Sequence, residues 1–228
     1  MAEIVQGVRY AVDIVMCIDT TRSMYELLEK VKAGAIQFHE DLNRRLKEKD
    51  RLVDTLRVRV IAFRDFYADG DKSLRTSPFF TLPQDKEGFS AFVKTLEPDG
   101  GGDEPETSLE ALAIAIKSDW LKGDSKQRQV IVMWTDASAH PLEKNDNSKP
   151  SHYPADMPKN FDDLTDWWEG QSYLSNKAKR LILYAPDAYP WTDISNHWNN
   201  CVHYPSKAGA GLEEMDYVKI VDTIANSV

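Results

Sequence analysis

The sequence predicts an α/β fold: a doubly wound, Rossmann-like three-layer sandwich around a mostly parallel six-stranded sheet with one antiparallel edge strand. Two observations favour this class. Short apolar segments rich in Val and Ile, which are typical of strands buried on both faces, alternate with longer segments of helical periodicity. Clusters of polar side chains follow directly after buried strands, where open parallel sheets bind their ligands.

The bulk composition indicates an intracellular globular protein. The length of 228 residues suits one domain, which we expect to span residues 1–228 with an elaboration at about 140–178. A net charge of −9 argues against nucleic acid and anionic membranes as partners. The sequence contains no apolar run of roughly 18 residues and no secretory leader pattern. Cys17 and Cys201 lie in apolar segments and are expected to be reduced, so we expect a cytoplasmic location.

The first half of the chain predicts one edge of the sheet. Strands are expected at residues 8–19 and 56–63, separated by a helix that begins at Ser23. The apolar residues of this helix are Leu28, Val31, Ala35, Phe38, Leu42 and Leu46. A short strand at residues 77–81 follows too soon for a crossover helix, so it should pair antiparallel at the edge, where Pro78 is tolerated.

The second half continues the alternation of helices and strands. The expected helices are residues 86–96, Pro105 to about Lys117, 162–171, 191–200 and 213–228, and the expected strands are residues 129–134, 179–186 and 201–204. The last helix should bury Met215, Val218, Val221 and Ile224 on one face. Residues 140–178 interrupt the alternation with prolines and polar residues, so we interpret them as an elaboration over one end of the sheet.

Oxygen-bearing side chains are expected to meet at the carboxyl edge of this sheet. Asp19, Thr21 and Ser23 follow the first strand, Asp103 lies in the glycine-rich stretch 99–106, and Asp136 follows the strand at residues 129–134. If the strands that end near Asp19 and Asp136 are neighbours, these side chains flank a topological switch point. Hydroxyl and carboxylate ligands without His or Cys favour Mg²⁺, with Mn²⁺ or Ca²⁺ as alternatives, over zinc.

A purely structural role is also open for two of these residues. Ser23 with Glu26, and Asp103 with Glu106, have capping-box spacing, and acids favour the first turn of a helix. Under this alternative Ser23 and Asp103 only cap helices.

With these residues the sequence resembles a von Willebrand factor type A domain. The metal-ion-dependent adhesion site of that family has the motif Asp-x-Ser/Thr-x-Ser, which occurs here at residues 19–23. A separate loop of the family donates a Thr or Asp, which corresponds to Asp103, and the acid after the fourth strand corresponds to Asp136. The resemblance extends from about Val8 to Val228. It implies a Mg²⁺ site with the ligands Asp19, Thr21, Ser23, Asp103 and Asp136.

A narrower resemblance concerns an intracellular branch of the family that includes stand-alone bacterial proteins. It depends on residues 63–65, on the stretch 100–106, and on residues 135–137 followed by His140. Arg22 departs from the family, which has Gly at this position. Arg22 could pair with an incoming carboxylate or be a solvated surface charge. With Asp103 instead of Thr, three carboxylates surround the ion, which strengthens its binding but weakens its attraction for an acidic group.

Other polar and aromatic residues leave two interpretations open. Asp65 could support the metal ligands through hydrogen bonds, or cap a loop together with Arg64. His140 could line the rim of the site or be solvated. Trp167 and Trp168 could form a patch that faces a partner, or anchor the elaboration to the core.

The resemblance favours a divalent-metal-dependent protein-binding module, regulatory or scaffolding, that engages an acidic side chain of a partner protein. The alternative is a metal-dependent hydrolase or phosphotransferase that uses the same ion. We find no nucleophile–base pair in the sequence, so we assign no catalytic residue and expect no enzyme. A third hypothesis is a scaffold whose site stays empty.

Overall fold

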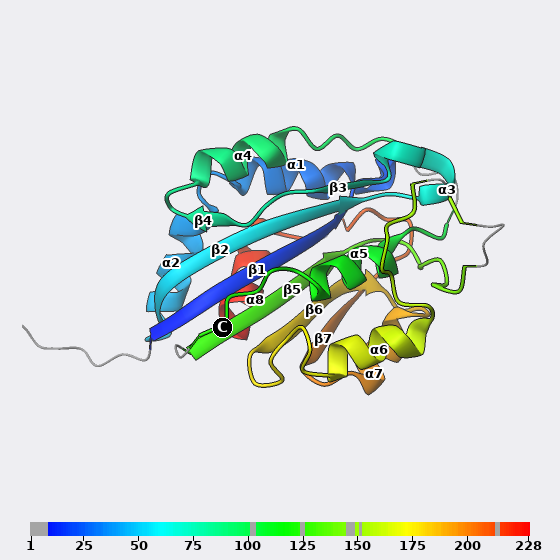
Figure 1. The fold of residues 1–228 in the computed structure, drawn as a ribbon. Helices are drawn as coiled ribbons and strands as arrows, with labels where there is room; N and C mark the ends of the chain where they lie inside the picture. Colours follow the sequence, from blue (N-terminus) through cyan, green and yellow to red (C-terminus); the bar gives the residue numbers. More distant parts are fainter. Residues whose placement is uncertain (1–8, 101–103, 124–125, 145–148, 151, 213–214) are drawn as a thin grey trace, which may run out of the picture.

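A central sheet with helices on both faces dominates the computed structural model, which describes residues 9–100, 104–123, 126–144, 149–150, 152–212 and 215–228 (Figure 1). Within these residues the strands are β1 (Arg9–Asp19), β2 (Leu52–Phe63), β3 (Leu74–Thr76), β4 (Phe80–Leu82), β5 (Lys126–Trp134), β6 (Lys179–Pro186) and β7 (Cys201–Ser206). The strand order is β3-β2-β1-β5-β6-β7, and β4 also pairs with β2. The predicted α/β sandwich is confirmed: β1, β2, β5, β6 and β7 run parallel.

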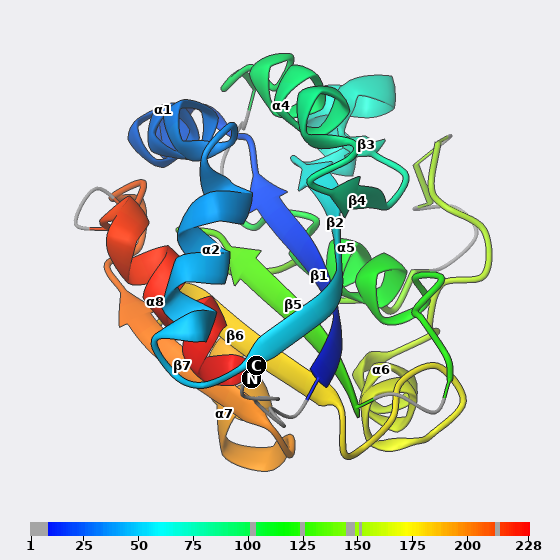
Figure 2. The ribbon, with the colours of Figure 1, turned by 90° about the vertical axis from the view of Figure 1, so that its left-hand side faces the viewer.

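Helices cover the sheet in two layers (Figure 2). The described helical segments are η1 (Arg22–Met24), α1 (Tyr25–Gly34), α2 (Phe38–Lys47), α3 (Phe66–Asp69), η2 (Gly70–Lys72), α4 (Lys86–Lys94), α5 (Ser108–Ile116), α6 (Phe161–Glu169), α7 (Trp191–His197) and α8 (Tyr217–Ser227). The side chains of α1, α2, α4 and α8 enclose one hydrophobic core, and those of α5, α6 and α7 enclose the other. No helix in the described part of the chain is long and apolar enough to cross a membrane.

The central strand β1 is buried on both faces because its side chains alternate between the two cores. Val12, Ile14, Met16 and Ile18 point into the first core, and Val15 and Cys17 into the second. This explains why residues 14–18 form a continuous apolar run instead of alternating with polar residues.

The topology places the ends of β1 and β5 side by side. Ile18 of β1 pairs with Ala62 of β2 on one side and with Trp134 of β5 on the other. The chain winds outward from β1 through β2, then returns to β5 on the opposite side of β1. The residues that follow these strands, Asp19 and Asp136, therefore lie at the topological switch point that the sequence analysis required.

The antiparallel edge consists of two short strands instead of one. β3 and β4 flank residues 77–79, and both pair antiparallel with β2. Between them Ser77 continues the edge, since its N–H donates to the Val60 carbonyl (2.9 Å) and its hydroxyl accepts from the Val60 N–H (2.9 Å). The predicted strand at 77–81 is thus correct in direction but wrong in its bounds, because Pro78 interrupts regular pairing.

The single helix predicted from Ser23 is wrong, since the chain breaks after Gly34 into α1 and α2. Tyr217 packs on Gly34 so closely that a Cβ at this glycine would lie 2.1 Å from a ring carbon. The Gly34 carbonyl accepts from the Tyr217 hydroxyl (3.1 Å) and, in a tight turn, from the Gln37 N–H (3.0 Å). The break redirects α2 along α8.

The ends of two other helices also differ from the prediction. The helix expected from Pro105 begins at Ser108, because Glu106 forms a bridge with Ala139 instead of a helical turn. In the C-terminal helix α8 the buried residues are Ile220, Val221, Ile224 and Ala225. Val218, expected on this face, is 45 % exposed.

Helix α6 fastens residues 152–178 to the second core. Trp168 is fully buried, stacks on Trp198 (centroids 5.6 Å apart) and donates its indole N–H to the Asn199 carbonyl (2.9 Å). Trp167 is half-buried against Tyr173. The anchoring interpretation of the tryptophan pair is therefore confirmed for Trp168.

Candidate metal centre at the carboxyl ends of β1 and β5

Asp19, the last residue of β1, presents a fully buried carboxylate. One oxygen, Oδ1, accepts hydrogen bonds from the backbone N–H and the hydroxyl of Thr21 (2.9 and 2.7 Å). The other, Oδ2, accepts from the hydroxyl of Thr135, at the end of β5 (2.7 Å). Donors from both neighbouring strand ends thus fix the orientation of this carboxylate.

Asp136 presents the second buried carboxylate, 2 % exposed, at the end of β5. Its Oδ1 accepts from the Ser23 hydroxyl (3.0 Å), and its Oδ2 accepts from the Gly211 N–H (2.8 Å). The Asp136 carbonyl accepts from the Gly209 N–H (2.9 Å). The loop between β7 and α8 therefore holds Asp136 in place.

The hydroxyls of Thr21 and Ser23 lie 3.3 Å apart and join the two carboxylates into one network. Four of the five predicted ligands, Asp19, Thr21, Ser23 and Asp136, are therefore brought together as predicted. The alternative role of Ser23 as a helix cap is wrong, because Met24 occupies the N-cap of α1.

Burial raises the pKa of Asp19 to about 6. The hydrogen bonds from Thr21 and Thr135 oppose this shift, and the charge of Asp136 adds to it. A raised carboxyl pKa means that a negative charge at this place lacks compensation. A cation between Asp19 and Asp136 would supply it.

The buried side chain of Arg64 brings the segment before the glycine-rich loop to this site. It donates to the Thr20 carbonyl from Nε (3.2 Å) and to the Glu97 carbonyl from Nη2 (2.7 Å). The Asp99 N–H donates to the same Thr20 carbonyl (3.1 Å). The glycine-rich loop therefore starts beside the residues that follow β1.

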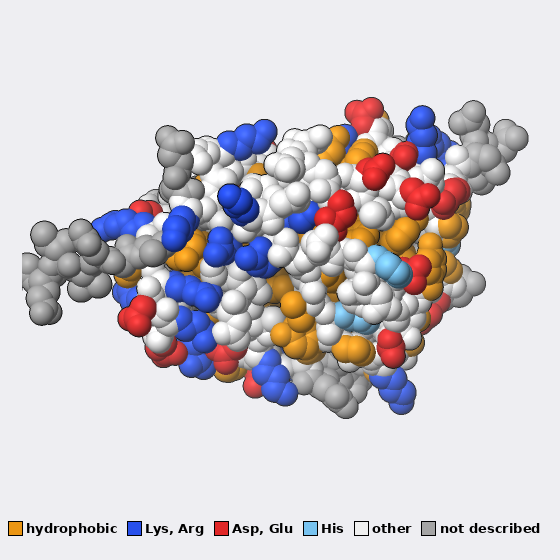
Figure 3. All heavy atoms as spheres, turned by 90° about the horizontal axis from the view of Figure 1, so that it is seen from below, with side chains coloured by type: hydrophobic (Ala, Val, Ile, Leu, Met, Phe, Trp, Pro, Cys, Tyr) orange, Lys and Arg blue, Asp and Glu red, His pale blue; other side chains and the backbone are white. Residues whose placement is uncertain are grey.

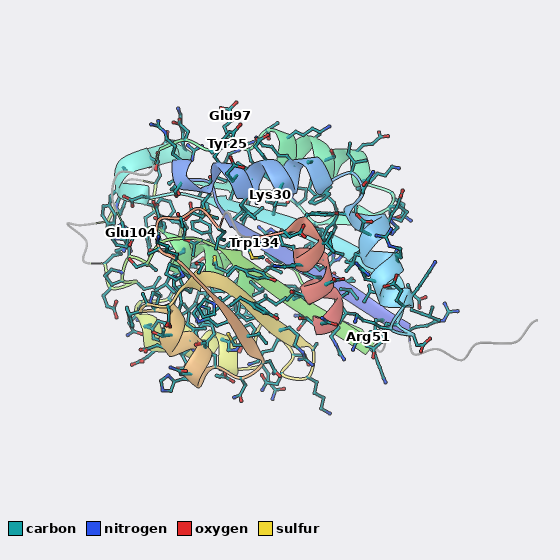
Figure 4. The ribbon with its side chains drawn as sticks, turned by 180° about the vertical axis from the view of Figure 1, so that it is seen from behind. Tyr25, Lys30, Arg51, Glu97, Glu104 and Trp134 are labelled. Atoms are coloured by element: carbon teal, nitrogen blue, oxygen red, sulfur yellow. The ribbon has the colours of Figure 1, made fainter. Side chains whose placement is uncertain are left out.

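Asp103, the fifth predicted ligand and the alternative capping residue, lies outside the described residues. Its role as a metal ligand stays a prediction, whereas the N-cap of α5 is Thr107 and not Asp103. Glu104, just after it, lies at the end of the molecule where β1 and β5 end (Figure 4). The side chain of Arg22 is 81 % exposed and lies 3.6 Å from the Asp99 carboxylate, so Arg22 is a solvated surface charge in this structure.

Asp65 and His140 form a pair beside the site. Asp65 Oδ1 accepts from the Tyr67 N–H (2.9 Å) and thereby caps α3. The same oxygen lies 3.0 Å from His140 Nε2. Burial raises the pKa of Asp65, but the contacts with His140 and Tyr67 outweigh this and lower it overall. His140, 19 % exposed, is thus tied to Asp65.

The loop between β7 and α8 contacts both Asp136 and Ser23, and it was not predicted from the sequence as part of the site. A Cβ at Gly211, whose φ is +61°, would lie 2.0 Å from the Ser23 carbonyl oxygen. Only glycine allows the backbone to approach this closely in the left-handed region. The available signal was the alternation Gly209-Ala210-Gly211 shortly after a predicted strand.

The oxygen donors of this centre suit a hard cation such as Mg²⁺, Mn²⁺ or Ca²⁺. In the described part of the chain no three His, Cys, Asp or Glu side chains converge on one point. The described donors are therefore two carboxylates and two hydroxyls, which fits a divalent ion that keeps several waters. On the face shown in Figure 3, acidic side chains gather toward the end where the strands terminate, and this favours cations.

Residues 13–151 match the family model of the von Willebrand factor A domain. This span contains all five predicted ligands. A comparison with curated proteins finds no match.

Solved structures of a pilus adhesin share this fold. The pilus adhesin SpaC from Lactobacillus rhamnosus GG has a TM-score of 0.55 and 11 % identity, over 95 % of this chain and 30 % of the adhesin. The open conformation of the same adhesin has a TM-score of 0.54 and 12 % identity over the same shares of the two chains. Proximal thread matrix protein 1 from the mussel byssus has a TM-score of 0.49 and 13 % identity. The alignment covers 96 % of this chain and 49 % of that protein. The chain thus spans about 30 % of the adhesin's length, and the similarity concerns the fold.

Proposed function

The chain belongs to the von Willebrand factor A domain family, and we propose that it is a divalent-metal-dependent protein-binding module, regulatory or scaffolding. Its site would engage an acidic side chain of a partner protein through the bound ion. Asp19, Thr21, Ser23 and Asp136 would hold the ion, together with Asp103 from the glycine-rich loop.

One observation carries the proposal: the hydrogen-bonded network that joins Asp19, Thr21, Ser23 and Asp136 across two strand ends. The donors that orient these two buried carboxylates are hydroxyls and backbone N–H groups, which carry no positive charge. When bound, a divalent ion supplies a positive centre that attracts an anionic group. The protein's own donors orient the carboxylates and hydroxyls, so the site needs little rearrangement to take the ion.

Thermal unfolding with and without metal tests this proposal. At a metal concentration about 100 times the dissociation constant, Mg²⁺, Mn²⁺ or Ca²⁺ should raise the melting temperature by about 5–10 °C, because the ion binds only the native state. Asp19→Asn and Asp136→Asn should abolish this rise. Asp13→Asn is the control, since Asp13 is equally buried in the middle of β1, away from the strand end that carries Asp19, and pairs with Arg57 (2.7 Å). An equal rise in all the variants would refute the site.

The acidic partner group is tested separately. The protein is used as bait in a lysate of the cells that naturally produce it. A partner captured by the wild type in Mg²⁺ should be lost when chelator is added, and lost when the bait is Asp136→Asn. Replacing single Asp or Glu residues of that partner by the corresponding amides should then identify the bound acid. A partner that binds equally well in chelator would contradict the proposal.

We further propose that the module is not an enzyme. A phosphoester and a peptide substrate should show no turnover above background in Mg²⁺ or Mn²⁺. Turnover that disappears in Asp19→Asn would favour the alternative, a metal-dependent hydrolase or phosphotransferase.

The cytoplasmic location and the place in an intracellular bacterial branch remain parts of this proposal. Cys17 and Cys201 are both free thiols. Burial raises the pKa of the Cys201 thiol to about 12 and that of Cys17 further, so both stay protonated and unreactive. Two unreactive thiols support a reducing compartment but do not require one. Fractionation of host cells tests the location.

A further inference from the structure

Glu106 is a buried acid that neither the predicted metal site nor a helix cap explains. The residue is 4 % exposed, and its Oε2 has no hydrogen-bond partner in the described structure. The predicted capping box with Asp103 does not account for it, because Thr107 is the N-cap of α5. A buried carboxylate oxygen without a donor is destabilising unless a proton or a cation compensates it.

The backbone of Glu106 fixes this residue beside the loop that carries Asp136. Its N–H donates to the Ser138 carbonyl (2.9 Å), and its carbonyl accepts from the His140 N–H (2.9 Å). These bonds make a parallel bridge with Ala139. These bonds therefore fix the position of the Glu106 backbone relative to the loop that follows β5.

The charged neighbours of Glu106 that raise its pKa are acidic, so they disfavour a further negative charge on its carboxylate. Burial is the largest cause that raises its pKa, to about 9, and four neighbouring carboxylates add to the shift. These neighbours are Asp19, Asp65, Asp69 and Asp136. A divalent ion held by Asp19 and Asp136 would reverse this local field.

The next glutamate in the sequence, Glu110 in α5, differs from Glu106 because it has a cation beside it. It is equally buried, and its Oε2 likewise has no hydrogen-bond partner in the described structure. However, Lys144 Nζ lies 3.5 Å from its Oε1, and the Tyr153 hydroxyl donates to the same oxygen (3.0 Å). Glu110 therefore has a cation within its own neighbourhood. Glu106 instead lies among carboxylates, and its backbone is bonded to the segment just after Asp136.

We propose that Glu106 positions the bound cation by accepting a hydrogen bond from a water molecule that completes the shell of the ion. This inference rests on the proposed metal site and adds to it Glu106, which is not among the five predicted ligands. Because three described carboxylates then act on one divalent ion, the protein retains the ion more tightly than Asp19 and Asp136 alone would allow.

Glu106→Gln tests the proposal, with Glu110→Gln as the matched control. Both replacements remove one buried carboxylate from neighbouring positions and keep the side-chain shape. Isothermal titration with MnCl₂ and MgCl₂ measures affinity, and thermal unfolding in chelator measures the stability of the metal-free protein. We expect Glu106→Gln to weaken metal binding by about 10–100-fold, the range for residues that orient a metal shell. The melting temperature in chelator should not fall, since no hydrogen bond to Oε2 is lost. Glu110→Gln should keep wild-type affinity.

The outcomes separate this inference from the proposed function. Wild-type affinity in Glu106→Gln, with binding lost in Asp136→Asn, would overturn the role of Glu106 and leave the metal site standing. Equal weakening by Glu110→Gln would also overturn it, since the effect would then be one of overall charge. A wild-type protein that binds no metal would refute both. If Glu106→Gln does not fold, Glu106→Asp, which keeps the charge but shortens the reach, should still weaken binding.

Discussion

At the scale of single residues, the motif residues were predictable because each is a polar side chain directly after a buried strand. Asp19 and Asp136 could be found this way, and their neighbourhood followed from a parallel sheet with a switch point. Glu106 could not be found, because its significance depends on a missing hydrogen-bond partner, and the sequence carries no sign of that.

Asp65 gives a prediction about pH at this scale. Its pKa is lowered in the folded protein, so the ionised carboxyl stabilises the fold above its unfolded pKa, and this contribution is lost as the pH falls through the folded pKa. Asp65→Asn can keep the cap on the Tyr67 N–H but loses the charge that faces His140. We expect it to lower the free energy of unfolding by about 1 kcal/mol at pH 7.

Urea unfolding at a series of pH values measures this difference. The gap between wild type and Asp65→Asn should close in acid, where the wild-type carboxyl is protonated. A gap that stays constant from pH 7 to below the pKa of an ordinary aspartate would contradict the lowered pKa of Asp65. Asp54→Asn is a surface control, because Asp54 pairs with Arg9 and both side chains are about half or more exposed.

At the scale of elements, the core strands were predictable and the helix ends were not. The apolar side chains of β1 and β5 reflect burial on both faces of the sheet, and such apolar runs are visible in the sequence. The break after Gly34 depends on Tyr217, a residue far away in the chain. Tertiary contacts of this kind decide where helices end, so pattern analysis merged α1 and α2.

The loop between β7 and α8 gives the prediction at this scale. Gly209 and Gly211 both have a positive φ, +66° and +61°, so alanine at either position is strained by about 1–2 kcal/mol. A Cβ at Gly209 meets nothing within 4 Å, whereas one at Gly211 collides with the Ser23 carbonyl. Gly211→Ala should therefore lower the free energy of unfolding by about 1–3 kcal/mol more than Gly209→Ala.

The same pair of variants tests whether this loop supports the metal centre. Gly211→Ala displaces the N–H that holds Asp136, so the metal-induced rise in melting temperature should shrink. Gly209→Ala should keep that rise at its lower melting temperature. Equal metal responses in the two variants would mean that the loop does not position Asp136.

At the scale of the whole molecule, the family match ends within the elaboration, before α6, β6, β7 and α8. The second half of the sheet and the loop that holds Asp136 come from these later elements. The candidate site therefore depends on residues beyond the matched span, and this favours the proposal that residues 1–228 fold as one domain.

Unfolding experiments test this proposal of a single domain. Trp168 of α6 lies in the same core as Val15 of β1, and the buried ammonium of Lys179 in β6 donates to the Trp168 carbonyl. We expect tryptophan fluorescence and far-ultraviolet circular dichroism to report one coincident urea transition. Lys179→Met removes the donor to that carbonyl and the ammonium beside Glu169. It should lower the free energy of unfolding equally by both probes, by several kcal/mol or less. A separate early fluorescence transition would show that α6 and its neighbours unfold on their own, and would divide the chain into two units.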